Sequence, residues 1–351
     1  QKQASLCYKK LSMSKKNSSV ILKNGFKDFP DLNKIYLNFK NKIIQTRIKS
    51  FIVAISGGPD SLALAALTKA LKSEKKYNFQ YVLINHNIRK NSSFEAKQVK
   101  KLLKVNNINL KVLHNKIKIK NNLQSHARNL RYDLLVKYCL KKNTKSILTA
   151  HNLEDQVETF LIRLSRGSGL TGLSAMKFET KLNSKIKLCR PLLDVKKKSL
   201  EKISKKIFGR FFKDPTNTNK KYLRTKIRLL RKPLSESGLD YDQIIKSINN
   251  LASSKAILDE YYKNIFNKVV KKTKEYILIN YSIFENLSEE IKIKIINDSI
   301  KTIIKNYYNL RASKVIRLIS NMKDEEFTSR TLGGCIFSRK KEYISLKKEK
   351  K

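Results

Sequence analysis

The sequence predicts an α/β protein with a parallel sheet, followed by a second, smaller and mostly helical domain. From residue 51 onward, short β-branched runs alternate with longer runs that carry apolar residues at helical spacing. The strand-like runs are almost wholly apolar, which is typical of parallel strands that helices cover on both faces. A basic stretch with many turn residues, 209–233, then interrupts the pattern and indicates a domain boundary.

The alternation can be followed element by element along the chain. The predicted strands are 51–55, 80–85, 110–115 and 146–150. The helices that follow them are 61–73, 92–105, 123–142 and a helix from His151. Since each strand reaches the next through a helix, the strands should be parallel. Ligands of such sheets bind at the carboxyl ends of the strands, so residues directly after these strands are the first candidates for a site.

The rest of the chain has a different pattern. Residues 240–325 carry apolar positions at helical spacing, and residues 327–350 indicate a short hairpin with Gly333 and Gly334 in or beside its turn. We expect a disordered leader at 1–20, a first domain at 21–215, and a mostly helical domain with a short C-terminal hairpin at 216–351.

The chain is strongly basic. Its 77 Lys and Arg residues against 28 Asp and Glu residues give a formal charge of +49. Such a field attracts polyanions, and nucleic acid is the first partner it suggests. The alternative is a coding bias toward Lys, Asn and Ile, in which case part of the charge is only solvated surface. Only 15 of the cations are Arg, and ten of these lie between Arg89 and Arg231, which suggests that this region needs a planar, bidentate cation.

Cysteine spacing and hydropathy argue against several classes of protein. The four cysteines form no C-x-x-C pair, which argues against a zinc ribbon, an iron–sulfur cluster or a redox dithiol. No apolar run approaches the ~18 residues of a membrane span, and the first residues lack the apolar core of a secretory signal. We therefore expect a cytoplasmic protein whose cysteines are reduced: Cys7, Cys139, Cys189 and Cys335.

The loop Ser56-Gly57-Gly58-Pro59-Asp60-Ser61 directly follows the first predicted strand. Glycines let main-chain N–H groups approach a ligand closely, and such amides before a helix N-terminus bind phosphate. The serines add hydroxyl groups, and the Asp60 carboxylate could hold Mg²⁺ against phosphate oxygens. This loop matches neither G-x-x-x-x-G-K-[ST] nor G-x-G-x-x-G, so neither a P-loop kinase nor a dinucleotide site is expected here. A plain glycine-rich turn would explain the glycines but not the whole set.

The helix expected from His151 carries a polar face. The side chains of His151, Asp155 and Glu158 lie at i, i+4 and i+7 and share that face. Another face, which we expect to pack on the sheet, is apolar: Val157, Phe160, Leu161 and Leu164. The polar face would then point at the strand ends, where a nucleotide would bind. The alternative is an ordinary solvated face of an amphipathic helix.

The loop carries a resemblance to a known superfamily. SGGPDS after a strand resembles the pyrophosphate-binding loop of the N-type ATP pyrophosphatases. These enzymes share a Rossmann-like PP-loop ATPase domain and cleave ATP to AMP and pyrophosphate while adenylating a substrate oxygen. The superfamily includes GMP, NAD and argininosuccinate synthetases and tRNA-modifying enzymes. The loop alone therefore implies a chemistry and leaves the substrate open.

Further motifs resemble one family of this superfamily, the tRNA(Ile)-lysidine synthetases. The segment from His151 resembles H-x-x-D-D-Q-x-E-T followed by R-G-S-G-L-x-G-L. Four other pieces match in chain order: INHNIR around His86, A-R-x-x-R-Y from Ala127, CRPLL from Cys189 and DPTN with RTKIR from Asp214. Together they cover about residues 50–232, and an ordered set of motifs is far more specific than any single one.

The match departs from the family pattern at five positions: Asn152, Glu154, Thr216, Thr225 and Lys226. Most of these changes are mild. Asn152 stands where a second His is common, which leaves His151 as the only imidazole in that segment.

The resemblance implies a role for each matched residue. The residues implied to bind ATP pyrophosphate are Ser56, Gly57, Gly58, Pro59, Asp60 and Ser61. Asp60 would also place Mg²⁺, while Asp155 and Glu158 would bind the lysine ammonium and orient or deprotonate its amine. The residues implied near the nucleotide are His86, Arg128 and His151. A basic helical stripe would contact the tRNA backbone: Arg224, Arg228, Arg231 and Lys232. The alternative for this stripe is a solvated interdomain helix.

A member of this family would be a ligase that uses ATP and Mg²⁺ to adenylate the C2 oxygen of the wobble cytidine of tRNA(Ile) with a CAU anticodon. The ε-amine of free L-lysine would then displace AMP and form lysidine. Domain 21–215 would be catalytic and domain 216–351 would bind tRNA. No membrane partner is expected, and a homodimer is left open. The alternatives are another PP-loop enzyme, such as a tRNA cytidine thiolase, and a non-catalytic RNA-binding protein that retains a nucleotide fold.

Overall fold

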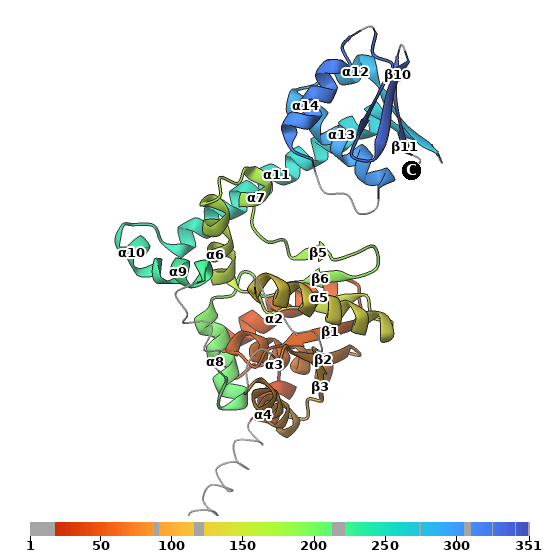
Figure 1. The fold of residues 1–351 in the computed structure, drawn as a ribbon. Helices are drawn as coiled ribbons and strands as arrows, with labels where there is room; N and C mark the ends of the chain where they lie inside the picture. The colour runs from red at the N-terminus through yellow and green to blue at the C-terminus, as the bar shows by residue number, and fades with distance from the viewer. Residues whose placement is uncertain are drawn as a thin grey trace, which may run out of the picture. The chain divides into compact units, whose positions relative to one another are not determined.

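The computed structural model describes residues 18–87, 91–115, 123–212, 222–273, 275–304, 310–324, 326–340 and 342–349. The chain divides into two compact units, Gln1–Leu251 and Ala252–Lys351, which we describe separately (Figure 1). The domain boundary predicted after residue 215 lies outside the described residues. The helices between that point and Leu251 belong to the first unit, which is therefore larger than the predicted first domain.

Part of the predicted leader belongs to the folded structure. Residues 1–17 lie outside the described part of the chain, whereas residues 18–23 are helical. Ser18 is buried, and its hydroxyl donates a hydrogen bond of 2.9 Å to the carbonyl of Ile207.

The first unit is built on a six-stranded sheet of order β3-β2-β1-β4-β6-β5 (Figure 1). Its strands are β1 (Ser50–Ile55), β2 (Asn78–Asn85), β3 (Leu110–His114), β4 (Ser146–Leu148), β5 (Glu179–Lys181) and β6 (Lys187–Cys189). Every neighbouring pair is parallel except β5 with β6, which confirms the predicted parallel sheet. The chain runs from β1 outward to β3 and returns to β4 on the other side of β1. The topological switch point therefore lies between β1 and β4.

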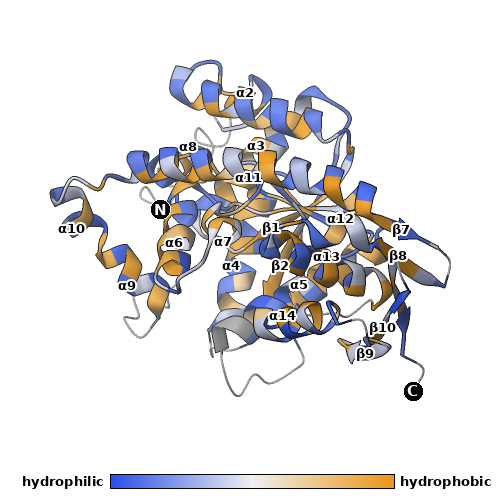
Figure 2. Ribbon diagram, turned by 90° about the horizontal axis from the view of Figure 1, so that it is seen from above, coloured by the Kyte–Doolittle hydropathy of each residue, from blue (hydrophilic) through white to orange (hydrophobic). Residues whose placement is uncertain are grey.

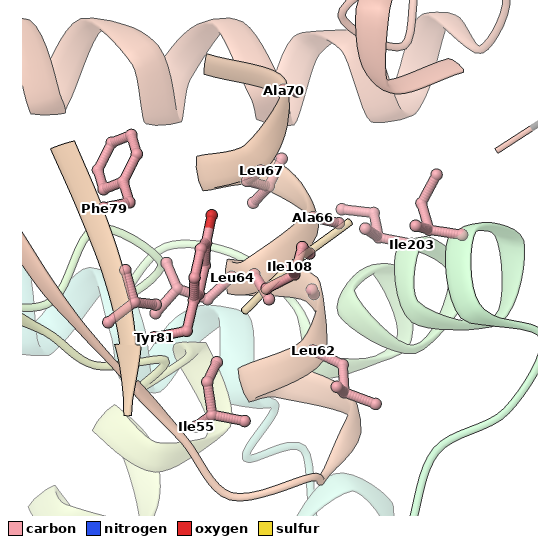
Figure 3. Packing of buried hydrophobic residues seen from close by; sticks show 14 of the residues in the cluster. Ile55, Leu62, Leu64, Ala66, Leu67, Ala70, Phe79, Tyr81, Ile108 and Ile203 are labelled. Atoms are coloured by element: carbon pink, nitrogen blue, oxygen red, sulfur yellow. The ribbon is translucent and has the colours of Figure 1, made fainter. Parts of the chain in front are cut away.

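Helices cover both faces of this sheet, which explains why its strands are apolar throughout. Alternate β1 residues point to opposite faces, so Phe51 and Val53 join one core cluster and Ile52 joins the other. The first face is covered by α2 (Pro30–Gln45), α3 (Pro59–Glu74), α4 (Ser92–Val105) and α8 (Lys197–Phe208). The second is covered by α5 (Leu123–Lys141). In Figure 3, α3 passes between Phe79 and Tyr81 of β2 and Ile203 of α8.

Helix α3 is a rigid base for the loop that precedes it. Pro59 stands at its first helical position, where a missing N–H costs nothing. Its alanines let neighbouring elements approach closely, and almost the whole helix before Lys72 is buried. By contrast, α2 shows hydrophilic and hydrophobic residues in alternation along its length in Figure 2, as expected of a helix with one solvated face. The loop after β1 is therefore anchored to the most buried helix of the unit.

The remaining helices of the first unit pack together at one end of the sheet. They are α6 (Leu153–Leu164), α7 (Leu170–Leu173), α9 (Leu223–Leu229), α10 (Arg231–Glu236) and α11 (Tyr241–Val269), whose last part belongs to the second unit. Val157 of α6 packs against Ile244 and Ile248 of α11. The prediction that this apolar face packs on the sheet is wrong, because the sheet faces are already covered by other helices. Leu164, expected on the same face, is exposed.

In its described residues, the second unit has a five-stranded antiparallel sheet of order β7-β8-β11-β10-β9, the last part of α11 and three further helices. Its strands are β7 (Val270–Lys272), β8 (Tyr276–Asn280), β9 (Ser329–Leu332), β10 (Cys335–Lys340) and β11 (Tyr343–Lys348), and its helices are α12 (Tyr281–Glu285), α13 (Glu289–Ile303) and α14 (Ala312–Asn321). Gly333 and Gly334 join β9 to β10 with φ of 62° and 77°, which confirms the predicted turn. The predicted hairpin is thus part of a larger sheet.

Within the described ranges, no helix combines the length and the apolar character that crossing a membrane requires.

Candidate active site

Several loops meet at one edge of the first unit's sheet, where its parallel strands end. Ser56 follows β1, His86 lies just beyond β2, His151 lies just beyond β4, and Arg190 follows β6. Because the crossover helices run back along the sheet, the N-terminal turns of α3 and α5 lie at this same edge. The loops after β1 and β4 flank the switch point, where ligands of open parallel sheets bind.

The loop Ser56–Ser61 is organised around one hydroxyl group. Ser61 Oγ accepts hydrogen bonds from the N–H groups of Ser56 at 3.1 Å and Gly57 at 3.2 Å. It also donates to the carbonyl of Gly58 at 3.0 Å, and the Ser61 side chain is buried. Ser61 therefore holds the loop backbone in shape, and Ser56 is the more exposed of the two serines.

The two glycines of the loop are needed for different reasons. Gly57 has φ of 86°, and a Cβ added there would lie 2.6 Å from Val99 Cγ2. At Gly58, φ is −73°, and the nearest atom to an added Cβ is Ser56 Oγ at 3.6 Å. Folding therefore requires glycine at position 57. At position 58 an added Cβ would make only an ordinary van der Waals contact, so the fold does not itself require glycine there.

Asp60 lies in the first turn of α3 with an unsatisfied carboxylate oxygen. Its Oδ1 atom is buried and has no hydrogen-bond partner among the described residues. Burial, followed by the nearby Asp155 carboxylate, raises the pKa of Asp60 to about 7. A buried oxygen without a donor and beside a second carboxylate fits a divalent cation, which would supply the missing positive charge.

The N-terminus of α6 is closed by a capping box. Asn152 Oδ1 accepts from the N–H of Asp155 at 2.9 Å, and Asp155 Oδ2 accepts from the N–H of Asn152 at 3.2 Å. These bonds fix Oδ2 of Asp155, whereas Oδ1 lies 4.0 Å from Arg228 Nη2 of α9. Asn152, a departure from the family pattern, thus has a clear structural role as the cap.

The two histidines predicted near the nucleotide are both neutral. Burial lowers the pKa of His151 to about 4, and its Nδ1 shares a 2.9 Å hydrogen bond with Thr149 Oγ1. Burial and Arg131 lower the pKa of His86 to about 4, and Arg131 Nε donates to His86 Nε2 at 3.4 Å. At neutral pH both rings can offer hydrogen bonds to a nucleotide but no positive charge.

Glu158 is buried and paired with two arginines of α9. Its side chain is 5% exposed, so the alternative of a solvated helix face is wrong for this residue. Arg228 donates to it through Nε at 2.6 Å and Nη2 at 3.1 Å, which is a bidentate pair. Arg224 Nε lies 2.9 Å from Glu158 Oε2 without hydrogen-bond alignment, and its Nη2 donates to Thr159 Oγ1 at 3.1 Å. Arg228 Nη2 also lies 4.0 Å from Asp155 Oδ1.

The predicted basic stripe therefore divides into two parts. Arg224 and Arg228 pair with Glu158 of α6. Arg231 Nη1 also lies 3.7 Å from Glu154 Oε1 of α6, but the Arg231 side chain is 59% exposed and that of Lys232 is 86% exposed. The Arg231 guanidinium lies 4.9 Å from the centroid of the Tyr241 ring. Lys232 forms only a 3.5 Å pair with Glu236 on its own helix. Only the second part has the accessibility that a phosphate backbone needs.

Arg128 and Arg190 lie on the other side of the β4 loop. Arg128 is an exposed residue of α5, and its guanidinium lies 5.2 Å from the Tyr132 ring centroid. Arg190 is buried and was not singled out by the sequence, although its C-R-P-L-L motif was a signal that could have identified it.

A further glycine motif does not form a nucleotide site. Gly167–Gly172 reads G-x-G-x-x-G, but it follows helix α6 and precedes the four-residue helix α7. A dinucleotide fingerprint requires a strand before it and a full helix after it. Arg163 instead closes this turn by donating to the carbonyls of Gly172 at 2.6 Å and Ala175 at 3.1 Å.

Known proteins match both the sequence and the fold. The PP-loop domain matches residues 31–233. The tRNA(Ile)-lysidine synthase of Wolbachia pipientis wMel is 34% identical over 288 residues, which are 81% of this chain and 67% of that protein. The tRNA(Ile)-lysidine synthase of Orientia tsutsugamushi (strain Boryong) is 31% identical over 309 residues, which are 85% of this chain and 69% of that protein.

A solved structure supports the fold of the first unit. The U34-tRNA thiolase NcsA from Methanococcus maripaludis, solved with its 4Fe–4S cluster, superposes with a TM-score of 0.51 at 18% identity. The match covers 62% of this chain and 79% of that one. At this identity the likeness concerns the fold alone.

Proposed function

The chain belongs to the tRNA(Ile)-lysidine synthase family, and from this premise we propose how its residues carry out the reaction. A PP-loop ligase of this family uses ATP to adenylate the C2 oxygen of the wobble cytidine of tRNA(Ile), and it forms lysidine by attaching lysine through its ε-amine. AMP and pyrophosphate are released. The observation that supports our assignment is the unpaired Oδ1 of Asp60, which belongs to the Ser56–Ser61 loop and lies near the Asp155 carboxylate.

The loop and the N-terminus of α3 would bind the pyrophosphate of ATP. The first amides of a helix have no partner within the helix and carry a partial positive charge. The lack of a side chain at Gly58 would let a phosphate approach the backbone, while Ser61 keeps the loop in place. This arrangement requires no rearrangement of the buried helix α3 on binding.

Asp60 would hold the Mg²⁺ that accompanies ATP. The ion would supply positive charge that neutralises the leaving pyrophosphate. In the chain itself, the unpaired Oδ1 of Asp60 and the neighbouring Asp155 carboxylate repel each other. Binding a cation would relieve this repulsion, which favours cation binding.

Asp155 is the first candidate to receive the lysine ε-amine. Its Oδ1 lies 4.0 Å from Arg228 Nη2, which is beyond hydrogen-bond distance, so this oxygen can still accept from an amine. Both carboxylate oxygens of Glu158 already contact Arg228 or Arg224. Glu158 would therefore bind the lysine ammonium only if one of these arginines moved. Asp155 would orient the amine and take its proton as it attacks the adenylated C2 atom.

The tRNA would be held outside this pocket. The wobble cytidine must leave its stack to reach the site, as single-stranded RNA bases do when proteins read them. Arg231 and Lys232 are exposed enough to contact phosphates of the anticodon arm. A homodimer stays an expectation that the mass of the protein in solution would test.

The two alternatives are less well supported by the chemistry of the chain. A thiolase needs a reactive sulfur, whereas Cys139 and Cys189 are buried and burial raises their thiol pKa values, that of Cys139 to about 12. A non-catalytic RNA-binding protein would gain nothing from the costly burial of the Asp60 Oδ1 atom without a hydrogen-bond donor.

The decisive experiment is incubation of the purified chain with ATP, radiolabelled lysine and a tRNA(Ile) transcript that carries the CAU anticodon. We expect lysine to enter the tRNA with release of AMP. A transcript with a uridine at the wobble position is the matched control and should stay unlabelled. If folded protein neither labels the tRNA nor releases AMP, the proposed reaction is wrong.

A further inference from the structure

Arg190 is a buried cation without an acidic partner among the described residues. Arg190 is the residue that directly follows β6, and it is 7% exposed. Nη1 donates to the carbonyl of Lys177 and to Thr180 Oγ1, both at 2.9 Å. Nε is buried and has no hydrogen-bond partner. Within the described ranges, no carboxylate lies within ion-pair distance of this guanidinium.

Burying the Arg190 guanidinium costs free energy unless an anion pairs with it. Arginine remains protonated in proteins, so a buried guanidinium cannot escape its charge by losing a proton. Burial of an unpaired charge is unfavourable, and two neutral oxygens compensate it only in part. Arg224 and Arg228 show the contrast, because both are matched by the buried Glu158 carboxylate. Among the described residues, the cation at position 190 therefore lacks the carboxylate partner that the partly buried Arg224 and Arg228 have.

Arg190 lies beside the predicted nucleotide site. The parallel pairing of β4 with β6 places Leu148 opposite Cys189, and the N–H of Thr149 donates to the carbonyl of Cys189 at 3.0 Å. Arg190 and His151 therefore leave neighbouring strands at the same edge. The positive charges of Arg190 and Arg128 both help to lower the pKa of His151, as expected of close neighbours. Arg128 likewise has no ion pair with a described carboxylate.

We propose that Arg190 and Arg128 together form a phosphate-binding subsite at the carboxyl ends of β4 and β6. The subsite rests on the proposed function, which supplies two phosphates that could reach it. One is the α-phosphate of ATP, which stays on the nucleotide when pyrophosphate leaves. The other is a phosphodiester of the RNA next to the reacting cytidine. In both cases the planar guanidinium of Arg190 would fix the phosphate through paired hydrogen bonds.

A purely structural role for Arg190 makes a different prediction. The bonds to Lys177 and Thr180 brace the turn before β5 and β5 itself against the end of β6. If this brace were the whole function, loss of Thr180 Oγ1 and loss of the guanidinium would both lower stability, and neither would alter a phosphate contact.

The test compares Arg190→Met, Arg190→Lys and the matched control Thr180→Val, which removes the side-chain bond of the brace but keeps the cation and its bond to the Lys177 carbonyl. For each variant, the urea midpoint, the Kd for ATP with Mg²⁺, and the Kd for the CAU transcript over a salt series are measured. We expect Arg190→Met to weaken one ligand by about tenfold to a hundredfold, as loss of charge-assisted hydrogen bonds does. Arg190→Lys keeps the charge, so its affinity for that ligand should lie between those of Arg190→Met and wild type. It also provides the test if Arg190→Met does not fold. Thr180→Val should bind both ligands within about twofold of wild type.

The ATP measurement and the RNA measurement together identify which phosphate binds at the subsite. Weaker ATP binding with an unchanged salt dependence of RNA binding identifies the α-phosphate. A salt slope reduced by about 0.7, the value for one phosphate contact of single-stranded nucleic acid, identifies the RNA. Wild-type affinity of both Arg190 variants for both ligands would overturn the subsite. Lysine incorporation by the wild-type chain, measured in parallel, tests the proposed reaction independently, because these affinities need no turnover.

Discussion

At the scale of single residues, the two glycines of the loop separate folding from ligand binding. Gly57→Ala forces a side chain into a left-handed conformation and against Val99, so it should destabilise the chain by about 3 kcal/mol. Gly58→Ala meets no close atom and should change stability by less than about 1 kcal/mol. Urea unfolding of both variants measures the difference. ATP titration completes the test: Gly58→Ala should weaken ATP binding, and wild-type affinity would mean that no phosphate approaches this backbone.

Asp60 makes the stability of the unliganded chain depend on pH. Its pKa rises from 3.8 in an unfolded chain to about 7 in the folded one, so between these values the folded state binds the additional proton. Stability contributed by this group is therefore lost as pH rises from about 4 to about 7. Asp60→Asn cannot lose that proton. The variant should match wild type near pH 4 and become more stable by as much as roughly 4 kcal/mol above pH 7.

Urea midpoints of wild type and Asp60→Asn between pH 4 and 8 measure this difference, and the comparison cancels the titration of the histidines. The same variant should lose AMP release in the lysine incorporation assay, because an amide is a weak ligand for Mg²⁺. A stability difference that does not change with pH would show that the Asp60 carboxylate is already ionised at low pH in the folded chain.

The sequence predicted the acidic residues of the site better than the cationic ones. Asp60, Asp155 and Glu158 follow strand ends or occupy one helix face, which local spacing reveals. A basic helical stripe, however, has the same sequence signature whether it faces solvent or a carboxylate. Arg228 meets its partner Glu158 70 residues away in the chain, so only the tertiary structure could reveal that pairing.

At the scale of elements, α6 and α9 are held together by charge as well as by packing. Arg228→Met leaves the 5% exposed Glu158 with a single, poorly aligned guanidinium, so we expect a loss of about 3 kcal/mol. The double variant Arg228→Met with Glu158→Met should recover most of that loss, because no unpaired buried charge remains. Urea unfolding of the full cycle measures the coupling, and equal stability of the single and double variants would contradict this account.

Strands and helices were predicted well where the hydrophobic periodicity is strong, and poorly where tertiary contacts decide the structure. All four predicted strands of the first sheet form, since their apolar runs are long and bounded by turn residues. Strands β7 and β8 were instead predicted to be part of a helical region. Tyr276–Asn280 is a short apolar run, and such a run becomes a strand only because β11 is available to pair with it. The packing partner of α6 is likewise a tertiary fact that helical spacing does not contain.

At the scale of the whole molecule, the charge of +49 had two interpretations, a nucleic-acid surface or a coding bias. Family membership assigns a tRNA as substrate but does not say which cations bind it. The structure separates cations by their position: Arg231 and Lys232 lie near α6 and the site, whereas Lys75 and Lys76 lie where β2 begins, at the opposite edge of the sheet. The two pairs of cations carry equal charge. Removing each pair in turn can therefore distinguish direct contact with the tRNA from attraction by the basic surface as a whole.

The salt dependence of tRNA binding measures that distinction. If Arg231 and Lys232 contact phosphates, the double variant Arg231→Gln with Lys232→Gln should reduce the slope of log K against log salt by about 1.4 to 1.8, because each phosphate contact contributes 0.7 to 0.9. The matched variant Lys75→Gln with Lys76→Gln should leave the slope close to that of wild type, since exposed charges more than about 10 Å from the RNA are screened. Filter binding of the CAU transcript between 50 and 400 mM salt, about the range over which such contacts dissociate, provides both slopes. Equal slopes in the two variants would show that tRNA senses the basic surface as a whole, and the excess lysine would then be better explained by composition than by recognition.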